Sequence, residues 1–69
     1  SRESVIDSLI EGLAEREGMS PQDIISDIIT FAELSETDGD AKIYFEEVAE
    51  RIGIPHDEML AYAIKKAKE

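Results

Sequence analysis

The feature that most constrains this chain is an internal repeat of about 35 residues. Shifting the sequence by that amount aligns "EGLAEREGM" (11–19) with "EEVAERIGI" (46–54). Across positions 11–34 the two copies share more identical residues than chance would give; these are Glu11, Ala14, Glu15, Arg16, Gly18, Ile29 and Ala32. A repeat of this length predicts two copies of one supersecondary unit.

The repeated unit has the pattern of a helical hairpin. Apolar residues recur three and four positions apart through the first segment, which predicts a helix over Glu3–Glu17 that ends at Gly18. Ser20 then stands as an N-cap with Pro21 at the first position of a second helix. The second copy repeats this order around Gly53.

The predicted fold class is therefore all-α: a small four-helix domain built from two duplicated helical hairpins. We expect a single domain over 1–69, in which hairpin one spans 1–34, an acidic turn spans 35–41 and hairpin two spans 42–69. A tetratricopeptide-like array is not favoured, because the Trp, Tyr and Pro signature of that family is absent and a solenoid needs about three repeats.

The net charge of the chain limits the kinds of partner that it can bind. Seventeen acidic residues against seven basic ones give a net charge of −10, which repels phosphate backbones and anionic membranes and favours a basic protein surface. Nucleic acid is thus not an expected partner, and no apolar run is long enough to span a membrane. With no cysteine there is no disulfide and no thiol chemistry. We expect a cytoplasmic protein with no cofactor, except for the calcium discussed below.

The second helix carries more apolar residues than a single neighbour can cover. A chain of 69 residues also builds only a thin core. Both observations predict a homodimer whose interface is formed by Ile24, Ile25, Ile28, Ile29 and Phe31. The alternative is that this helix is simply the central helix of a monomer.

Oxygen-bearing side chains recur at intervals in the middle of the chain, in "ETDGDAKIYFEE" (36–47). The spacing resembles an EF-hand calcium loop, which takes ligands from positions 1, 3, 5, 7, 9 and 12. The resemblance implies a weak Ca²⁺ site formed by Glu36, Asp38, Asp40, the carbonyl of Lys42, Tyr44 through water, and Glu47. The alternative, which we favour, is an acidic turn in which Asp40 caps the third helix, because Ala41 stands where that loop needs glycine.

Both hairpins also resemble DNA-binding elements. The stretch 48–64 has the Ala49, Gly53 and Met59 spacing of a helix-turn-helix, and 5–29 is similar to the two helices of a ribbon-helix-helix repressor. However, His56 and two acids stand where a recognition helix contacts bases. A ribbon-helix-helix protein also reads DNA with a strand ahead of its first helix, where this sequence has only Ser1 to Glu3. If a strand had been removed from before Ser1, the chain would be the dimerising remainder of such a protein.

From these patterns we expect a non-catalytic protein-interaction or oligomerisation module. The only histidine, His56, has no nucleophile placed beside it by the sequence, so the chain is not expected to be an enzyme. A DNA-binding regulator, or a fragment of one, is the first alternative, and a weak calcium-binding protein is the second.

Overall fold

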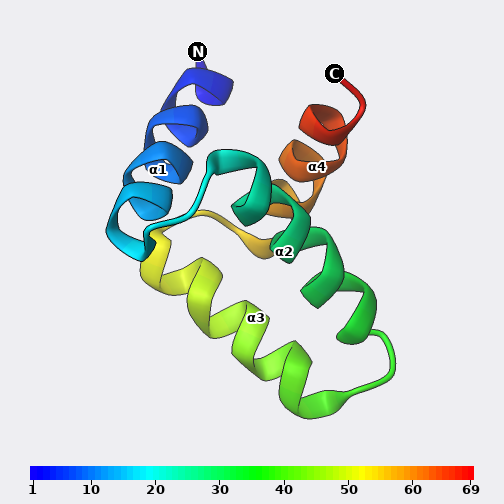
Figure 1. Cartoon of the computed structure of the whole chain (residues 1–69). Helices are drawn as coiled ribbons and strands as arrows, with labels where there is room; N and C mark the ends of the chain where they lie inside the picture. Colours follow the sequence, from blue (N-terminus) through cyan, green and yellow to red (C-terminus); the bar gives the residue numbers. More distant parts are fainter.

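The computed structural model describes residues 1–69 and contains four helices and no strand. The predicted all-α class with four helices is confirmed. The helices, shown in Figure 1, are α1 (Arg2–Glu17), α2 (Pro21–Leu34), α3 (Gly39–Ile52) and α4 (His56–Ala67). Two boundaries differ: α1 begins one residue earlier than predicted, and residues 39–41, which were predicted to lie in the acidic turn, already belong to α3.

The cap of α3 accounts for that difference. The side chain of Asp38 accepts hydrogen bonds from the backbone N–H groups of Asp40 (3.0 Å) and Ala41 (3.2 Å), so Asp38 is the N-cap. The prediction that Asp40 caps this helix is wrong. Asp38 has an extended backbone, as an N-cap requires, whereas Asp40 lies in the first helical turn.

The two repeats end their first helices in the same way. Gly18 (φ 67°) and Gly53 (φ 89°) both adopt the left-handed conformation. The amide of Gly18 donates to the carbonyls of Ala14 and Glu15, and the amide of Gly53 donates to the equivalent Ala49 and Glu50. In α2, Ser20 accepts from the amide of Asp23, which confirms the predicted cap.

Helix α2 lies at the centre of the fold. It packs against all three other helices, and its contact with α4 is the most extensive in the molecule. By contrast, α1 and α3 touch each other only weakly. Figure 1 shows α1 and α3 converging where both end, while the rest of the two helices diverge. The wide apolar face of α2 thus covers several neighbours within one chain.

The core is small and entirely apolar. Fourteen of the 69 residues are buried, and none of them is polar or charged. The largest side chains that are completely buried are Ile10, Ile54 and Met59. Tyr62, which counts here among the hydrophobic residues, carries the one hydroxyl in this core, and that hydroxyl donates a hydrogen bond to Asp7. None of the four helices combines the length and apolarity that crossing a bilayer demands.

The predicted dimer interface needs correction. Ile24, Ile25 and Ile28 are only 6%, 5% and 8% exposed, because they fill the core of a single chain. They cannot contact a second copy without unpacking that core. Of the five predicted residues, Ile29 is half-buried and Phe31 alone is exposed.

The glycine caps give a first prediction. Gly18→Ala and Gly53→Ala should each lower the free energy of unfolding by about 1 to 2 kcal/mol, because a side chain disfavours the left-handed conformation. A new Cβ atom would meet nothing within 4 Å at either site, so the cost comes from the backbone alone.

Gly12→Ala is the matched control. Gly12 lies inside α1 with room for a Cβ atom, so this change should raise the unfolding free energy by about 0.5 to 1 kcal/mol. Urea denaturation of the three variants measures the effects. Equal effects for all three glycines would contradict the assigned caps.

Candidate functional site

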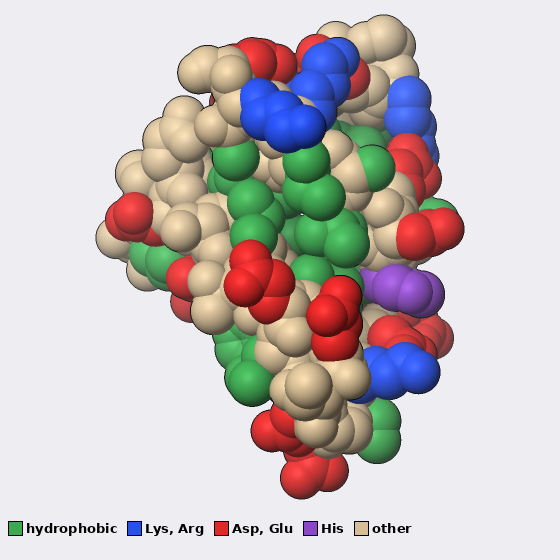
Figure 2. All heavy atoms as spheres, turned by 90° about the vertical axis from the view of Figure 1, so that its right-hand side faces the viewer, with side chains coloured by type: hydrophobic (Ala, Val, Ile, Leu, Met, Phe, Trp, Pro, Cys, Tyr) green, Lys and Arg blue, Asp and Glu red, His purple; other side chains and the backbone are tan.

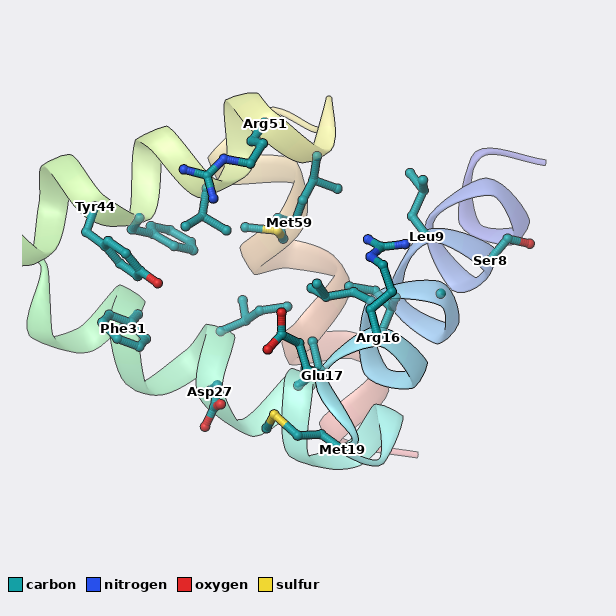
Figure 3. Close-up of a pocket in the computed structure, with 18 residues that line it drawn as sticks. Ser8, Leu9, Arg16, Glu17, Met19, Asp27, Phe31, Tyr44, Arg51 and Met59 are labelled. Atoms are coloured by element: carbon teal, nitrogen blue, oxygen red, sulfur yellow. The ribbon is translucent and has the colours of Figure 1, made fainter.

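A groove of about 590 Å³ lies between α1 and α3. Its sides come from these two helices, and buried side chains of α2 and α4, including Ile24, Ile28 and Met59, form its floor. Twelve of its 18 lining residues are hydrophobic, so the groove is mainly apolar. Figure 3 shows α1 and α3 on its two sides with Met59 between them.

The repeat builds the groove from both sides. Many of the lining residues form pairs that lie 35 positions apart, one member from each hairpin. These pairs are Leu9 and Tyr44, Ile10 and Phe45, Leu13 and Val48, Arg16 and Arg51, Glu17 and Ile52, and Ile24 and Met59. The two sides of the groove are therefore the same element used twice.

One end of the groove is aromatic. The rings of Phe31 in α2 and Tyr44 in α3 lie 5.3 Å apart, centroid to centroid, at a tilt of 38°. Both side chains line the groove and both are exposed. Aromatic side chains that remain accessible at the mouth of an apolar groove are typical anchors for a ligand or a partner side chain.

Two arginines also line the groove, one on each side. Arg16 comes from the last turn of α1 and Arg51 from the last turn of α3. Neither takes part in an ion pair, whereas Arg2, Lys65 and Lys66 all do. Sequence reasoning used these arginines only as a sign of the repeat. The sequence shows that both copies carry arginine at this position, but not that the two arginines face one groove.

A second cluster joins α1 to α4. The hydroxyl of the buried Tyr62 donates to the carboxylate of Asp7, and the Lys66 ammonium lies 3.3 Å from the same carboxylate. Next to it, Glu3 accepts a hydrogen bond from Lys65, and Arg2 pairs with Glu58 at the start of α4. Polar contacts thus hold together two helices that share only a limited packing surface.

This cluster shifts the pKa values of its members. The hydrogen bond from Tyr62, with help from Lys66, holds the pKa of Asp7 below its ordinary value. Hydrogen bonds from Lys65 and Arg2 likewise lower the pKa values of Glu3 and Glu58. Burial, together with the bond to Asp7, raises the pKa of Tyr62, so its phenol stays protonated. The protonated phenol therefore remains a hydrogen-bond donor to the Asp7 carboxylate.

The residues of the predicted calcium loop are not arranged as a loop. Asp40, Lys42, Tyr44 and Glu47 all lie within α3, and Asp38 is occupied as its N-cap. No group of three or more carboxylate or imidazole side chains is placed to hold a metal ion. Six ligands drawn from Glu36 to Glu47 would require the first turns of α3 to unwind. Calcium binding stays a prediction, and the structure does not bring its ligands together.

The start of α4 bears on the DNA-binding resemblance. In the first turn of α4, Asp57 accepts from the amide of Glu58, and the Glu58 side chain pairs with Arg2. His56 packs edge-on against Phe45, with the ring centroids 6.2 Å apart. This turn would present acidic groups to a base edge. The helix-turn-helix and ribbon-helix-helix resemblances stay predictions.

Comparisons of the chain with protein-family models, with curated proteins and with solved structures found no match.

Asp38 is the acidic residue that caps α3, so its removal should destabilise the chain more than removal of the neighbouring Asp40. Asp38→Ala should lower the free energy of unfolding by about 1 kcal/mol, because two backbone donors lose their acceptor. Asp40→Ala should cost only about 0.3 kcal/mol, since it removes a charge near the helix dipole. Thermal unfolding of both variants checks the order, and a larger loss for Asp40→Ala would contradict the cap.

The same helix start predicts the response to calcium. Titration with millimolar Ca²⁺ should leave the backbone amide signals of 36–48 without a saturable shift, because the helix holds the ligands apart. Glu47→Gln should behave as the original chain does. Saturable shifts confined to this stretch and lost in Glu47→Gln would show that α3 unwinds around an ion.

The Tyr62–Asp7 contact predicts a pH effect on stability. Because the pKa of Asp7 is lowered in the folded state, its stabilisation is present above the ordinary value of about 4 and is lost as the pH falls through the lowered one. Tyr62→Phe should therefore cost about 1 kcal/mol at pH 7 and much less once Asp7 is protonated.

Tyr44→Phe is the matched control, since the Tyr44 hydroxyl makes no hydrogen bond within the chain and the residue is exposed. Urea denaturation of both variants between pH 7 and strongly acidic pH measures the two differences. A cost for Tyr62→Phe that is the same at every pH would show that the hydroxyl contributes through packing alone.

Proposed function

We propose that this chain is a non-catalytic interaction module that binds an amphipathic helix of a partner protein in the groove between α1 and α3. The observation that carries this proposal is the groove itself. Its floor is apolar, and the helices on its two sides touch each other only weakly. An amphipathic helix that lays its apolar face into such a groove is a recurrent mode of protein recognition.

The length of the groove suits a helix. On each side the lining residues include a pair, Leu9 and Arg16 or Tyr44 and Arg51, with a separation of seven residues that is about 10 Å along a helix axis. A partner helix places three apolar anchors over that length, at i, i+3 or i+4, and i+7. Leu9, Phe31 and Tyr44 are partly exposed, at 37%, 36% and 53%, so burying the remainder of each side chain contributes about 0.5 to 1.5 kcal/mol.

A basic outer surface on the partner would complement the net charge of this chain. At −10, the chain attracts cationic proteins over a distance set by the ionic strength. Such attraction raises the association rate more than it raises the affinity. We therefore expect the partner helix to carry lysine or arginine on the face that points away from the groove.

Self-association is a second candidate, and a different surface favours it. Figure 2 shows hydrophobic side chains gathered in the middle of one face, with lysine or arginine side chains above them and acidic side chains below. On α2 and α4, Ile29 is half-buried and its repeat equivalent Ile64 is exposed. These side chains remain available to a second copy after Ile24, Ile25 and Ile28 are assigned to the core.

Charge separates the two candidates. The chain measures 24 Å along its intermediate principal axis, and we take this length as the distance between the centres of two associated copies. At that distance two charges of −10 repel by about 17 kcal/mol in water without salt. At an ionic strength of 0.15 M the repulsion falls to about 1 kcal/mol. Added salt should thus promote self-association, whereas it should weaken the binding of a basic partner helix.

The groove is tested with two matched pairs of exposed residues. Leu9 (37% exposed) lines the groove and Val5 (48%), one turn earlier in α1, does not. Tyr44 (53%) lines it and its neighbour Ile43 (58%) does not. Helical peptides selected from an amphipathic display library on the original chain should bind Leu9→Glu and Tyr44→Glu at least about tenfold more weakly.

Val5→Glu and Ile43→Glu should bind the same peptides within about twofold, because their charges lie outside the groove. Fluorescence anisotropy gives the affinities, and circular dichroism verifies that all four variants are folded. Equal affinities for the members of each pair would contradict docking in the groove. Failure of the library to yield any helix that binds the original chain would contradict the function itself.

A further inference from the structure

Arg16 and Arg51 are the two basic residues that line the groove, and neither has a carboxylate partner. The chain carries 17 acidic residues, yet no carboxylate oxygen lies within 4.0 Å of either guanidinium group. Arg2, which lies outside the groove, is paired with Glu58. Both groove arginines are exposed and are therefore accessible to a ligand.

The local sequence offers Arg16 no acidic neighbour and offers Arg51 one that it does not use. The residues three and four positions from Arg16 along the chain are Gly12, Leu13, Met19 and Ser20, none of which is acidic. Arg51 does have Glu47 one turn before it, in the favourable Glu-to-Arg order, but the two side chains form no ion pair. Figure 3 shows the two arginines on α1 and α3, on either side of the groove.

We propose that the partner helix carries a carboxylate on each flank of its apolar stripe, and that these two carboxylates pair with Arg16 and Arg51. This inference rests on the proposed function and adds the chemistry that the partner must present. A guanidinium group offers a planar fork of N–H donors that matches a carboxylate with two parallel hydrogen bonds. A helix lying over the groove would also remove water from around these pairs, which strengthens them.

The same groove indicates where the partner should not be acidic. Glu17 of α1 and Asp27 of α2 line it as well, and neither is paired. An acidic side chain placed beside them would be repelled, whereas a lysine would be attracted. The groove therefore distinguishes the orientation of the helix by charge as well as by shape.

A purely structural role for the arginines makes a different prediction. Each lies in the last turn of its helix, where any positive charge interacts favourably with the helix dipole. Lysine would serve that role as well as arginine, but it lacks the planar fork. Arg→Lys variants therefore separate recognition from stability.

The test uses a display library of amphipathic helices with a fixed apolar stripe and randomised flanks. Selection on the original chain should enrich aspartate and glutamate on both flanks. Arg16→Lys and Arg51→Lys should keep the unfolding free energy and each weaken the selected peptides by about threefold. Arg16→Glu and Arg51→Glu should each weaken them by about tenfold, and selection on the double variant should enrich lysine and arginine instead.

Lys42→Glu is the matched control, because Lys42 is an unpaired, exposed cation outside the groove. It should leave the affinity within about twofold. Helices that bind the groove without acidic flanks, or that bind Arg16→Glu and Lys42→Glu equally, would overturn this inference and leave the proposed function standing. A library without any groove-binding helix would overturn both.

Discussion

The packing of α2 against α4 is the interaction on which the rest of the structure depends. It is the most extensive contact between any two helices, and it joins the second helix of one repeat to the second helix of the other. Ala63 of α4 and its repeat equivalent Ile28 of α2 are both buried. Once these two helices occupy the centre, α1 and α3 are left to cover the outside. They meet only weakly, and the groove lies between them.

The duplication determines which kinds of side chain line the groove. Because α1 and α3 are copies of one element, most residues that line the groove from α1 have a counterpart that lines it from α3. Leu9 and Tyr44 supply apolar surface, and Arg16 and Arg51 supply charge. The polar cluster around Asp7 and Tyr62 does not follow the repeat, since it joins α1 to α4 on another side of the molecule. The groove thus reflects the duplication, whereas the polar cluster is particular to one pair of helices.

Local signals in the sequence were sufficient to predict the four helices. Gly18 and Gly53 stop helices because of their own conformational freedom, and Ser20 with Pro21 starts one through short-range hydrogen bonding and geometry. The start of α3 was harder to predict because both aspartates of "DGD" are suitable caps. The choice depends on the end of α2, where the amides of Thr37 and Asp38 both donate to the carbonyl of Leu34. That turn ends at Asp38, which is then free to cap α3.

The candidate site could not be predicted in the same way. Periodicity showed that α2 is apolar over a wide face but not how many helices cover it, so Ile24, Ile25 and Ile28 were assigned to a second copy. The groove depends on the separation of α1 and α3, and the packing of residues distant in the sequence sets that separation. The sequence shows arginine at the equivalent positions 16 and 51 of the two repeats. Only the fold shows that both arginines line one groove.

Solvent paramagnetic relaxation in NMR measures whether the groove between α1 and α3 is open in the isolated chain. A soluble gadolinium chelate should broaden the methyl signals of Leu9, Leu13 and Val48, which line the groove and are exposed or half-buried. The methyl signals of Ile10 and Ile54, both only 1% exposed, should stay sharp. Protection of Leu9, Leu13 and Val48 equal to that of Ile10 would contradict the account, because α1 and α3 would then be closed together or covered by a second copy.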